Sequence, residues 1–344
     1  MEYVGIDLHK RQSQICILTE AGELIEQTVA TTRERFSAVF GSRSRARILV
    51  EASTESEWVA QCLEGLGQDV IVADPNYAPM YPERRRRVKT NRRDAQTLAT
   101  ACRLGAYRPA HRVSAAQRRI RQQLLVREAL VRTRTRTIAM TGALIRGEGL
   151  RVRSGPAEHF RQRVEAVVLP DCLRTTVAPA LRLLQSLEGE MRDADRALAQ
   201  VAEDDPNVQR LMTAPGIGPV TATAFVATLD RVDRFAGAHQ VESYLGLVPR
   251  EASSADARRR GHITKAGDGR LRWLLVQVAW TVWRSPRAEA QPLRAWAMRI
   301  AARRGKAVAV VALARRMAGI LFAMWRDETT FESQRLGRRT RAVA

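Results

Sequence analysis

Cysteine, lysine and aromatic residues are all scarce in this chain of 344 residues. Its four cysteines are far apart and form no Cys-x-x-Cys pair, which excludes the common zinc-binding and thiol redox motifs. The N-terminus has no basic segment followed by an apolar run and a small-residue cleavage site, the pattern of a secretory signal. These absences predict a protein of a reducing, cytoplasmic environment.

Long uninterrupted apolar runs are also missing. The longest apolar stretch, residues 307–325, contains Arg315 and Arg316. Because a membrane-spanning helix needs about 20 predominantly apolar residues, this stretch predicts an amphipathic or core helix. We therefore expect no membrane partner.

Acidic residues are strongly outnumbered, with 36 against 57 basic residues, a net charge of +21 and a pI near 11.2. Such a balance predicts a polyanionic partner, for which nucleic acid is favoured over a membrane surface. Hydrophobic residues make up 45% of the chain, enough for two or three packed domains. Only four basic residues are lysines, and Lys10, Lys89 and Lys265 lie in segments that are singled out below on other grounds.

The first hundred residues alternate between strand and helix patterns. Three apolar segments joined by a polar break and a turn predict a meander of strands within residues 2–29. Further strands are predicted at 46–50 and 69–73, and helices at 54–66 and 91–104. This alternation predicts an α/β layer fold.

The middle of the chain has heptad spacing instead. One predicted helix carries Leu124, Val131, Ile138 and Ile145, and a second carries two apolar series, namely Val177, Leu184, Met191 and Leu198 together with Ala180, Leu187, Ala194 and Val201. The pattern favours an antiparallel coiled-coil arm, with ordinary packed bundle helices as the alternative. After a boundary at residues 204–206 the chain is predicted to be helical to about residue 331, except for one basic loop, and a polar tail follows.

Three acidic residues are candidate metal ligands. Asp7 lies in the first apolar strand, where burial of an unpaired carboxylate is costly. Glu51 immediately follows the predicted strand 46–50, and Asp94 is near the start of the helix 91–104. Phosphodiester chemistry commonly uses two metal ions about 4 Å apart held by carboxylates, so together these residues predict a divalent metal site. The alternative to a metal site is a structural role for each residue: Asp7 would form an ion pair, Glu51 would cap the following helix, and Asp94 would stabilise the start of its helix.

The C-terminal half offers two further candidate sites. Ser253 and Ser254 lie in the basic loop near Arg258, Arg259, Arg260 and Lys265, and arginines beside a hydroxyl suit phosphoryl chemistry, although serine pairs in loops often make only local hydrogen bonds. A glycine-bracketed turn at 215–222, with Gly216 and Gly218, predicts either a helix-hairpin-helix phosphate contact or a plain helix connection.

Two other groups of residues complete the candidates. The run of Arg84, Arg85, Arg86 and Arg87 before Lys89 borders the presumed metal site and favours nucleic-acid binding over a solvated loop. The C-terminal tryptophans lie at helical spacings among apolar residues and are predicted to belong to the core, namely Trp273, Trp280, Trp283, Trp296 and Trp325.

Three blocks carry a family resemblance. Residues 3–10, residues 49–52 and residues 89–95 resemble the three blocks of the DEDD transposases of the insertion-sequence 110 family, in its insertion-sequence 1111-like subgroup. The resemblance implies a RuvC-like, RNase H-like N-terminal domain, an antiparallel coiled-coil arm and a helical C-terminal domain with a helix-hairpin-helix element, thus α/β plus all-α. The implied boundaries are 1–110, 111–205, 206–331 and a basic tail at 332–344.

The resemblance also implies residue roles and partners. Asp7, Glu51, Asn91 and Asp94 take the positions of the metal ligands for Mg²⁺ or Mn²⁺, with Asn91 where the family has an aspartate. Ser254, with Ser253 as the fallback, takes the position of a nucleophile that forms a 5′-phosphoserine, and Ala255 stands where the family has glycine.

The expected function is that of a DNA transposase or recombinase of an insertion sequence. By the resemblance, a structured non-coding bridge RNA guides it, and a homo-oligomer, either dimer or tetramer, assembles a composite active site in the prokaryotic cytoplasm at the nucleoid. A hydrolytic Holliday-junction-type nuclease, and a catalytically impaired RNA- or DNA-binding relative, remain the alternatives.

Overall fold

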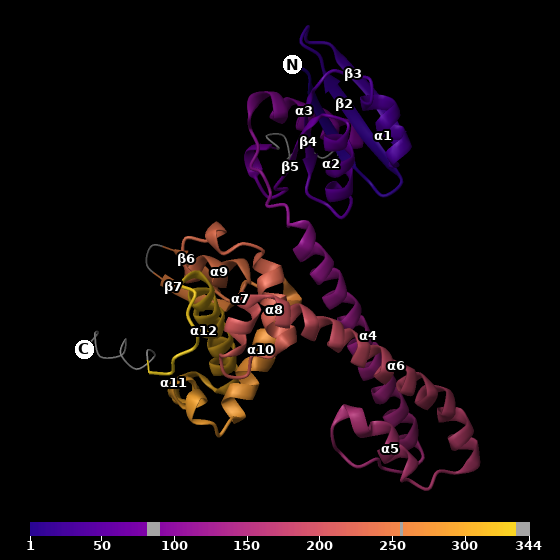
Figure 1. Ribbon diagram of the computed structural model, residues 1–344, viewed down its shortest axis with the longest axis vertical. Coiled ribbons are helices and arrows are strands. Elements are labelled where there is room, and N and C mark those ends of the chain that lie inside the picture. Colours follow the sequence, from indigo (N-terminus) through magenta and orange to yellow (C-terminus); the bar gives the residue numbers. More distant parts are fainter. Residues whose placement is uncertain (81–89, 255–256, 335–344) are drawn as a thin grey trace. The chain divides into compact units, whose positions relative to one another are not determined.

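The computed structural model describes residues 1–80, 90–254 and 257–334, and of residues 252–254 and 257–260 it describes the backbone alone. The chain divides into two compact units, Met1–Val113 and Ser114–Ala344 (Figure 1). Each unit has its own hydrophobic core, and each is described by itself below.

The first unit is built on a five-stranded sheet with the order β3-β2-β1-β4-β5. Its strands are β1 (Tyr3–Leu8), β2 (Gln12–Leu18), β3 (Leu24–Ala30), β4 (Arg47–Glu51) and β5 (Asp69–Ala73). The first three strands form an antiparallel meander, whereas β1, β4 and β5 run parallel. Its helices are α1 (Arg33–Phe40), α2 (Ser56–Gly65) and α3 (Asn91–Leu104). The predicted α/β layer is confirmed, and it is consistent with an RNase H-like domain.

The two faces of β1 contact different helices, because successive side chains of a strand point to opposite sides. Val4 and Ile6 are fully buried in the core that contains Phe36 of α1 and Leu63 of α2. Gly5 faces α3 instead. A Cβ atom added to Gly5 would lie 2.2 Å from the carbonyl oxygen of Ala95, so the backbones of strand and helix are in direct contact.

Two buried thiols fill the space beside α3. Cys16 of β2 packs against Ala95 and Ala99, and Cys102 of α3 lies in the cluster around Leu49. Burial raises the pKa of Cys16 to about 11 and that of Cys102 to about 12. Both thiols therefore stay protonated at neutral pH and serve as small packing groups.

The described part of the second unit contains helices and one hairpin. Its helices within the described residues are α4 (Ala115–Gly147), α5 (Phe160–Glu165), α6 (Asp171–Asp204), α7 (Pro206–Met212), α8 (Pro219–Leu229), α9 (Ala238–Tyr244), α10 (Gly269–Arg284), α11 (Gln291–Arg304) and α12 (Lys306–Arg326). The hairpin consists of β6 (Pro249–Ser254) and β7 (Ala257–Ile263). The sequence predicted only a loop here, so the hairpin corrects that prediction.

Helices α4 and α6 lie side by side in opposite directions (Figure 1). In the first half of α4, Arg127 pairs with Asp195 in the second half of α6, whereas Ile145 near the end of α4 packs in one cluster with Val177 near the start of α6. The heptad series of α6 that begins at Val177 is buried throughout, but Val131 of α4 is only partly buried. Knobs-into-holes packing of a coiled coil therefore remains a prediction for this antiparallel pair.

Helix α12 is a core helix. It is the one helix among the described residues that is long and apolar enough to cross a membrane by length and composition. Half of its most apolar window is buried within the unit, where Leu313, Met317 and Leu321 are fully buried. This packing agrees with the core helix predicted at residues 307–325.

The predicted core position is wrong for one tryptophan. Trp325 is buried, and Trp280, Trp283 and Trp296 are partly buried. Trp273 on α10 is 55% exposed. Its sequence spacing matches that of its neighbours, and only the three-dimensional packing separates it from them.

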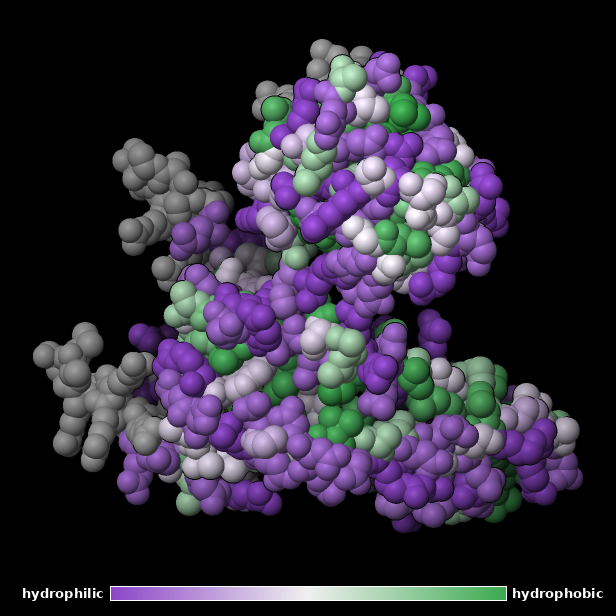
Figure 2. Space-filling model, turned by 45° about the horizontal axis from the view of Figure 1, so that its top comes forward, coloured by the Kyte–Doolittle hydropathy of each residue, from purple (hydrophilic) through white to green (hydrophobic). Residues whose placement is uncertain are grey.

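Hydrophilic residues cover most of the visible face in Figure 2, with apolar side chains between them. This surface agrees with the large excess of arginine in the sequence.

Candidate active site

Asp7 and Glu51 lie at the carboxyl ends of two adjacent parallel strands. The register pairs Ile6 of β1 with Val50 of β4, so the next residue on each strand is the acidic one. Asp7 lies two residues after Gly5, and Glu51 lies two residues after Leu49. Because side chains two residues apart on a strand point to the same face, both acids belong to the sheet face that α3 covers. Asp7 is only 9% exposed, and Nε2 of His9 lies 3.1 Å from its Oδ2 atom. Glu51 is the last residue of β4, not the residue after the strand as predicted.

Helix α3 brings its first turn to the same edge. The thiol of Cys102, near the end of α3, donates to the carbonyl oxygen of Arg47 at the beginning of β4, at 3.4 Å. Ala95, near the start of the helix, lies against Gly5 in the middle of β1. The helix therefore runs against the direction of β1 and β4, and Asn91 and Asp94 in its first turn lie toward the carboxyl ends of these strands.

Side-chain contacts fix the beginning of α3. Arg92 forms an ion pair with Glu26 of β3, and Nε2 of Gln96 donates to Oε1 of the same carboxylate at 2.6 Å. The hydrogen bond from Arg92 holds the pKa of Glu26 below its usual value. The hydroxyl of Thr90 accepts from the backbone N–H of Arg93 as an N-cap, at 3.4 Å.

The four residues at this edge have the chemistry of a divalent-metal site. Three carboxylates and the amide oxygen of Asn91 are the oxygen donors that Mg²⁺ prefers. Within residues 1–80, 90–254 and 257–334, no three His, Cys, Asp or Glu side chains are gathered closely enough to hold an ion. The backbone thus places the donors at one edge, while their side chains do not form a finished cluster.

Asn91→Asp is expected to strengthen Mg²⁺ binding about tenfold, because a carboxylate replaces a neutral amide among the donors. An aspartate in the first turn also stabilises a helix by about 0.3–1 kcal/mol without any metal. The measurement is therefore the increase in melting temperature on adding Mg²⁺, relative to the same protein in chelator. An identical Mg²⁺-dependent increase in the wild-type and Asn91→Asp proteins would remove residue 91 from the ligand set.

The hairpin that carries the candidate nucleophile is closed tightly at its base. Gly246 and Gly267 have φ angles of +67° and +69°. A Cβ atom would lie 2.3 Å from the carbonyl oxygen of Ala266 at Gly246, and 1.9 Å from that of Tyr244 at Gly267. Nη1 of Arg272 donates to the carbonyl oxygens of Leu245 and Ala266, both at 2.8 Å. Two glycines and one arginine thus join the two ends of the serine segment.

Gly267→Ala is expected to destabilise the second unit by about 3 kcal/mol or more, through a strained φ and a clash with the backbone of Tyr244. Gly261→Ala on the same hairpin is the matched control, since its added Cβ meets only ordinary contacts at 3.9 Å. Urea unfolding compares the two variants. Equal midpoints would show that the base of the hairpin tolerates a side chain.

Ser254 is the last residue of β6, and the backbone register pairs it with Ala257 and pairs Ser253 with Arg258. The same register places Arg259 and Arg260 on the strand facing the serines. Lys265, just beyond β7, has a φ of +58°, and its backbone N–H donates to the carbonyl oxygen of Gly246 at 3.1 Å. Ala255 lies outside the described residues, as do Arg84, Arg85, Arg86, Arg87 and Lys89.

Residues 213–218 connect α7 to α8, and the rest of the predicted glycine turn, residues 219–222, is the first turn of α8. Gly216 has a φ of +76°, and Gly218 is the N-cap residue of α8. Residues of the turn line one hollow together with Arg284 and Arg287, which the sequence reasoning missed. A phosphate contact at this turn would therefore have two guanidinium groups nearby, although the helix-hairpin-helix assignment stays a prediction.

Comparison with known proteins gives the family. The description "Transposase IS116/IS110/IS902 family" matches residues 208–293, and a DEDD transposase signature of the IS110 type, described as "Transposase", matches residues 4–147. A protein described as "Probable family 20 transposase" from Pseudomonas aeruginosa is 30% identical, over 95% of this chain and 98% of its own length.

Two relatives from named insertion sequences are also similar over most of their length. The transposase for insertion sequence element IS1111A of Coxiella burnetii is 26% identical, over 96% of this chain and 91% of its own. The transposase for insertion sequence element IS1328 of Yersinia enterocolitica is also 26% identical, over 95% of this chain and 98% of its own length. The chain therefore belongs to the IS110/IS1111 family of insertion-sequence transposases.

Proposed function

We propose that this transposase cuts and rejoins DNA strands with Ser254 as the nucleophile and with a divalent metal, Mg²⁺ or Mn²⁺, held by Asp7, Glu51, Asp94 and Asn91. The observation that carries the proposal is the strand register, which puts Asp7 and Glu51 next to each other beneath the first turn of α3.

The proposed step is a transfer of the DNA phosphate to serine. The Oγ atom of Ser254 loses its proton and forms a bond to phosphorus, while the bond from phosphorus to the 3′ oxygen breaks and that oxygen takes up a proton. The products are a 5′-phosphoserine and a free 3′-hydroxyl. A bound divalent cation would supply charge stabilisation at the phosphate, and the arginines of β7, on the strand paired with the serines, are proposed to supply further positive charge.

The proposed partners are DNA, a structured bridge RNA and further copies of the chain. DNA binding is expected of any transposase, and the turn around Gly216 and Gly218 and the residues Arg258, Arg259, Arg260 and Lys265 are proposed to hold phosphates. We also propose that a dimer or tetramer completes the active site, with the acidic edge from one copy and the serine from another. Recovery of one discrete RNA species with the purified protein would support the guide RNA.

Trapping tests the proposed reaction. The protein is incubated with DNA carrying its element's ends and Mg²⁺, then denatured, and a protein–DNA adduct is sought. Digestion and mass spectrometry should find a nucleotide on the peptide that contains Ser253 and Ser254, and should assign it to Ser254. Cut DNA with no adduct would favour the hydrolytic nuclease, and stable binding without cutting would favour the impaired nucleic-acid-binding relative.

A further inference from the structure

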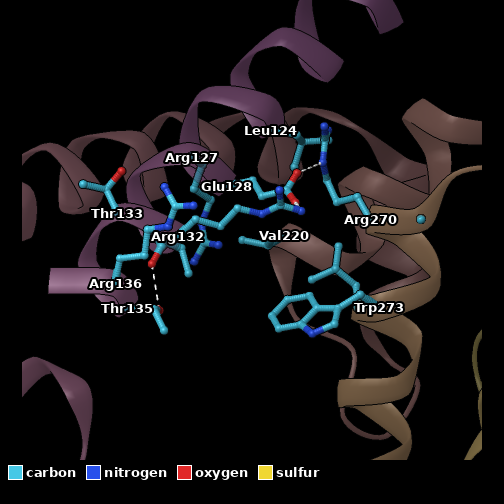
Figure 3. A pocket seen from close by; sticks show the side chains of 13 residues that line it. Leu124, Arg127, Glu128, Arg132, Thr133, Thr135, Arg136, Val220, Arg270 and Trp273 are labelled. Atoms are coloured by element: carbon cyan, nitrogen blue, oxygen red, sulfur yellow. Dashed lines mark hydrogen bonds and ion pairs between the residues drawn. The ribbon is translucent and has the colours of Figure 1, made fainter. Parts of the chain in front are cut away.

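A hollow in the second unit has no lining residue on the described part of the serine hairpin, and it shares only Val220 with the glycine turn at 215–222. It is bordered by α4, by the start of α8 and by the start of α10 (Figure 3). Apolar side chains of Leu124, Val131, Val220 and Leu274 form part of its wall. The remaining lining is dominated by arginine and by one aromatic ring.

The hollow carries net positive charge. Four arginines and one glutamate line it. Arg270 and Arg132 both pair with that glutamate, Glu128, and Arg127 pairs with Asp195 of α6. The four arginines and the carboxylates of Glu128 and Asp195 together carry a net charge of +2. Arg136 has no carboxylate partner among the described residues, so its guanidinium group is available to an anion. Arg132 shares Glu128 with Arg270, and its side chain is 77% exposed, so it can also contact an anion in solvent.

Trp273 supplies an exposed ring in the same hollow. Lys306 lies over the rings of Trp280 and Trp283, at 5.1 and 5.5 Å from their centres, and Arg316 lies 4.5 Å from that of Trp296. In the part of the chain that the structure describes, no lysine or arginine lies over the ring of Trp273, and the residue is 55% exposed. Figure 3 shows its indole on α10 across the hollow from Arg132 and Arg136 of α4.

We propose that this hollow binds an unpaired nucleotide, with its base stacked on Trp273 and its adjoining phosphates on Arg132 and Arg136. Aromatic stacking next to a basic track is the usual recognition mode for single-stranded nucleic acid. An apolar ligand would leave the arginines without counter-charges, and a duplex keeps the faces of its bases stacked inside. The inference rests on the proposed handling of nucleic acid by this transposase, and it adds a specific single-strand site.

Binding of labelled 12-mers by the full-length protein tests the site. Fluorescence anisotropy at fixed salt compares single-stranded oligo-dT, single-stranded oligo-U and a duplex. Trp273→Ala is expected to weaken single-strand binding about 5- to 100-fold, and Trp273→Phe, which keeps an aromatic face, much less. Duplex affinity is expected to change less than about twofold, because phosphate contacts dominate it.

Arg136→Gln gives a second, independent readout. Loss of one phosphate contact should reduce the slope of log affinity against log salt for the single strand by about 0.7. Met298→Ala is the matched control, because Met298 is a 48% exposed apolar side chain on another helix of the same unit. It should leave all three affinities and the salt slope unchanged.

The choice of strand distinguishes the two sources of an unpaired nucleotide. A larger loss of oligo-U affinity in Trp273→Ala assigns the site to RNA, and a larger loss of oligo-dT affinity assigns it to a displaced DNA strand; either supports the site. Unchanged single-strand affinity in Trp273→Ala, or an equal loss for single strand and duplex, would overturn it. None of these readouts needs strand cleavage, so a failed adduct experiment leaves this test intact.

Discussion

Replacing Ser254 by alanine is expected to abolish the covalent protein–DNA adduct and to lower strand cleavage by at least about 10³-fold. The loss follows from the proposed chemistry, because alanine has no atom that can form the bond to phosphorus. The backbone at this position is an ordinary strand paired with Ala257, which alanine also adopts. DNA binding, measured by electrophoretic mobility shift, should therefore be preserved.

Ser253→Ala is the matched control for this prediction. It removes a hydroxyl from the neighbouring residue of the same strand, so it tests whether the effect belongs to one position. We expect an adduct at close to the wild-type level. Cleavage that is undiminished in Ser254→Ala would reject the serine mechanism, and loss of the adduct only in Ser253→Ala would move the nucleophile by one residue.

Gly5→Ala is expected to destabilise the first unit by about 3 kcal/mol or more and to lower cleavage about 100-fold. The added Cβ would lie 2.2 Å from the carbonyl oxygen of Ala95 and 2.3 Å from the backbone nitrogen of Ala99. Since carbon contacts are normally about 3.5–4 Å, helix and strand must separate by on the order of 1 Å. Overpacking of this kind is costly, and a displacement of that size moves Asp94 away from Asp7 and Glu51.

Gly65→Ala in α2 is the control for the same substitution in the same unit. A Cβ at Gly65 meets nothing within 4 Å, and alanine is the better helix former, so this variant should be neutral or up to about 1 kcal/mol more stable. Thermal and urea unfolding give the stabilities, and a strand-cleavage assay gives the activities. A Gly5→Ala protein as stable and active as Gly65→Ala would show that α3 does not need this close approach.

The sequence predicted the first unit well because its elements have strong local patterns. The strand 69–73 and the helix 91–104 lie where they were predicted, with Asn91 and Leu104 as the helix limits. Asp7 and Glu51 are at one edge because parallel strands end together. Sequence patterns do not determine how side-chain oxygens gather, and the described carboxylates do not form a finished metal cluster.

Prediction was weaker in the second unit. The strands around the serines contain Ser, Ala and Arg without apolar alternation, so no pattern distinguished a hairpin from a loop. Trp273 shares a helix with Trp280, and its exposure depends on which neighbouring helices cover each turn. The division between an arm and a C-terminal region, and the coiled-coil packing of the arm, stay predictions.

Burial makes two of the four cysteines unreactive toward oxidising and alkylating agents. Reaction of a thiol requires its thiolate form, and that form is very rare for Cys16 and Cys102, whose pKa values are about 11 and 12. Cys172, in the first turn of α6, is exposed. Alkylating and oxidising agents therefore reach a helix of the second unit long before they reach the packing beneath the acidic edge.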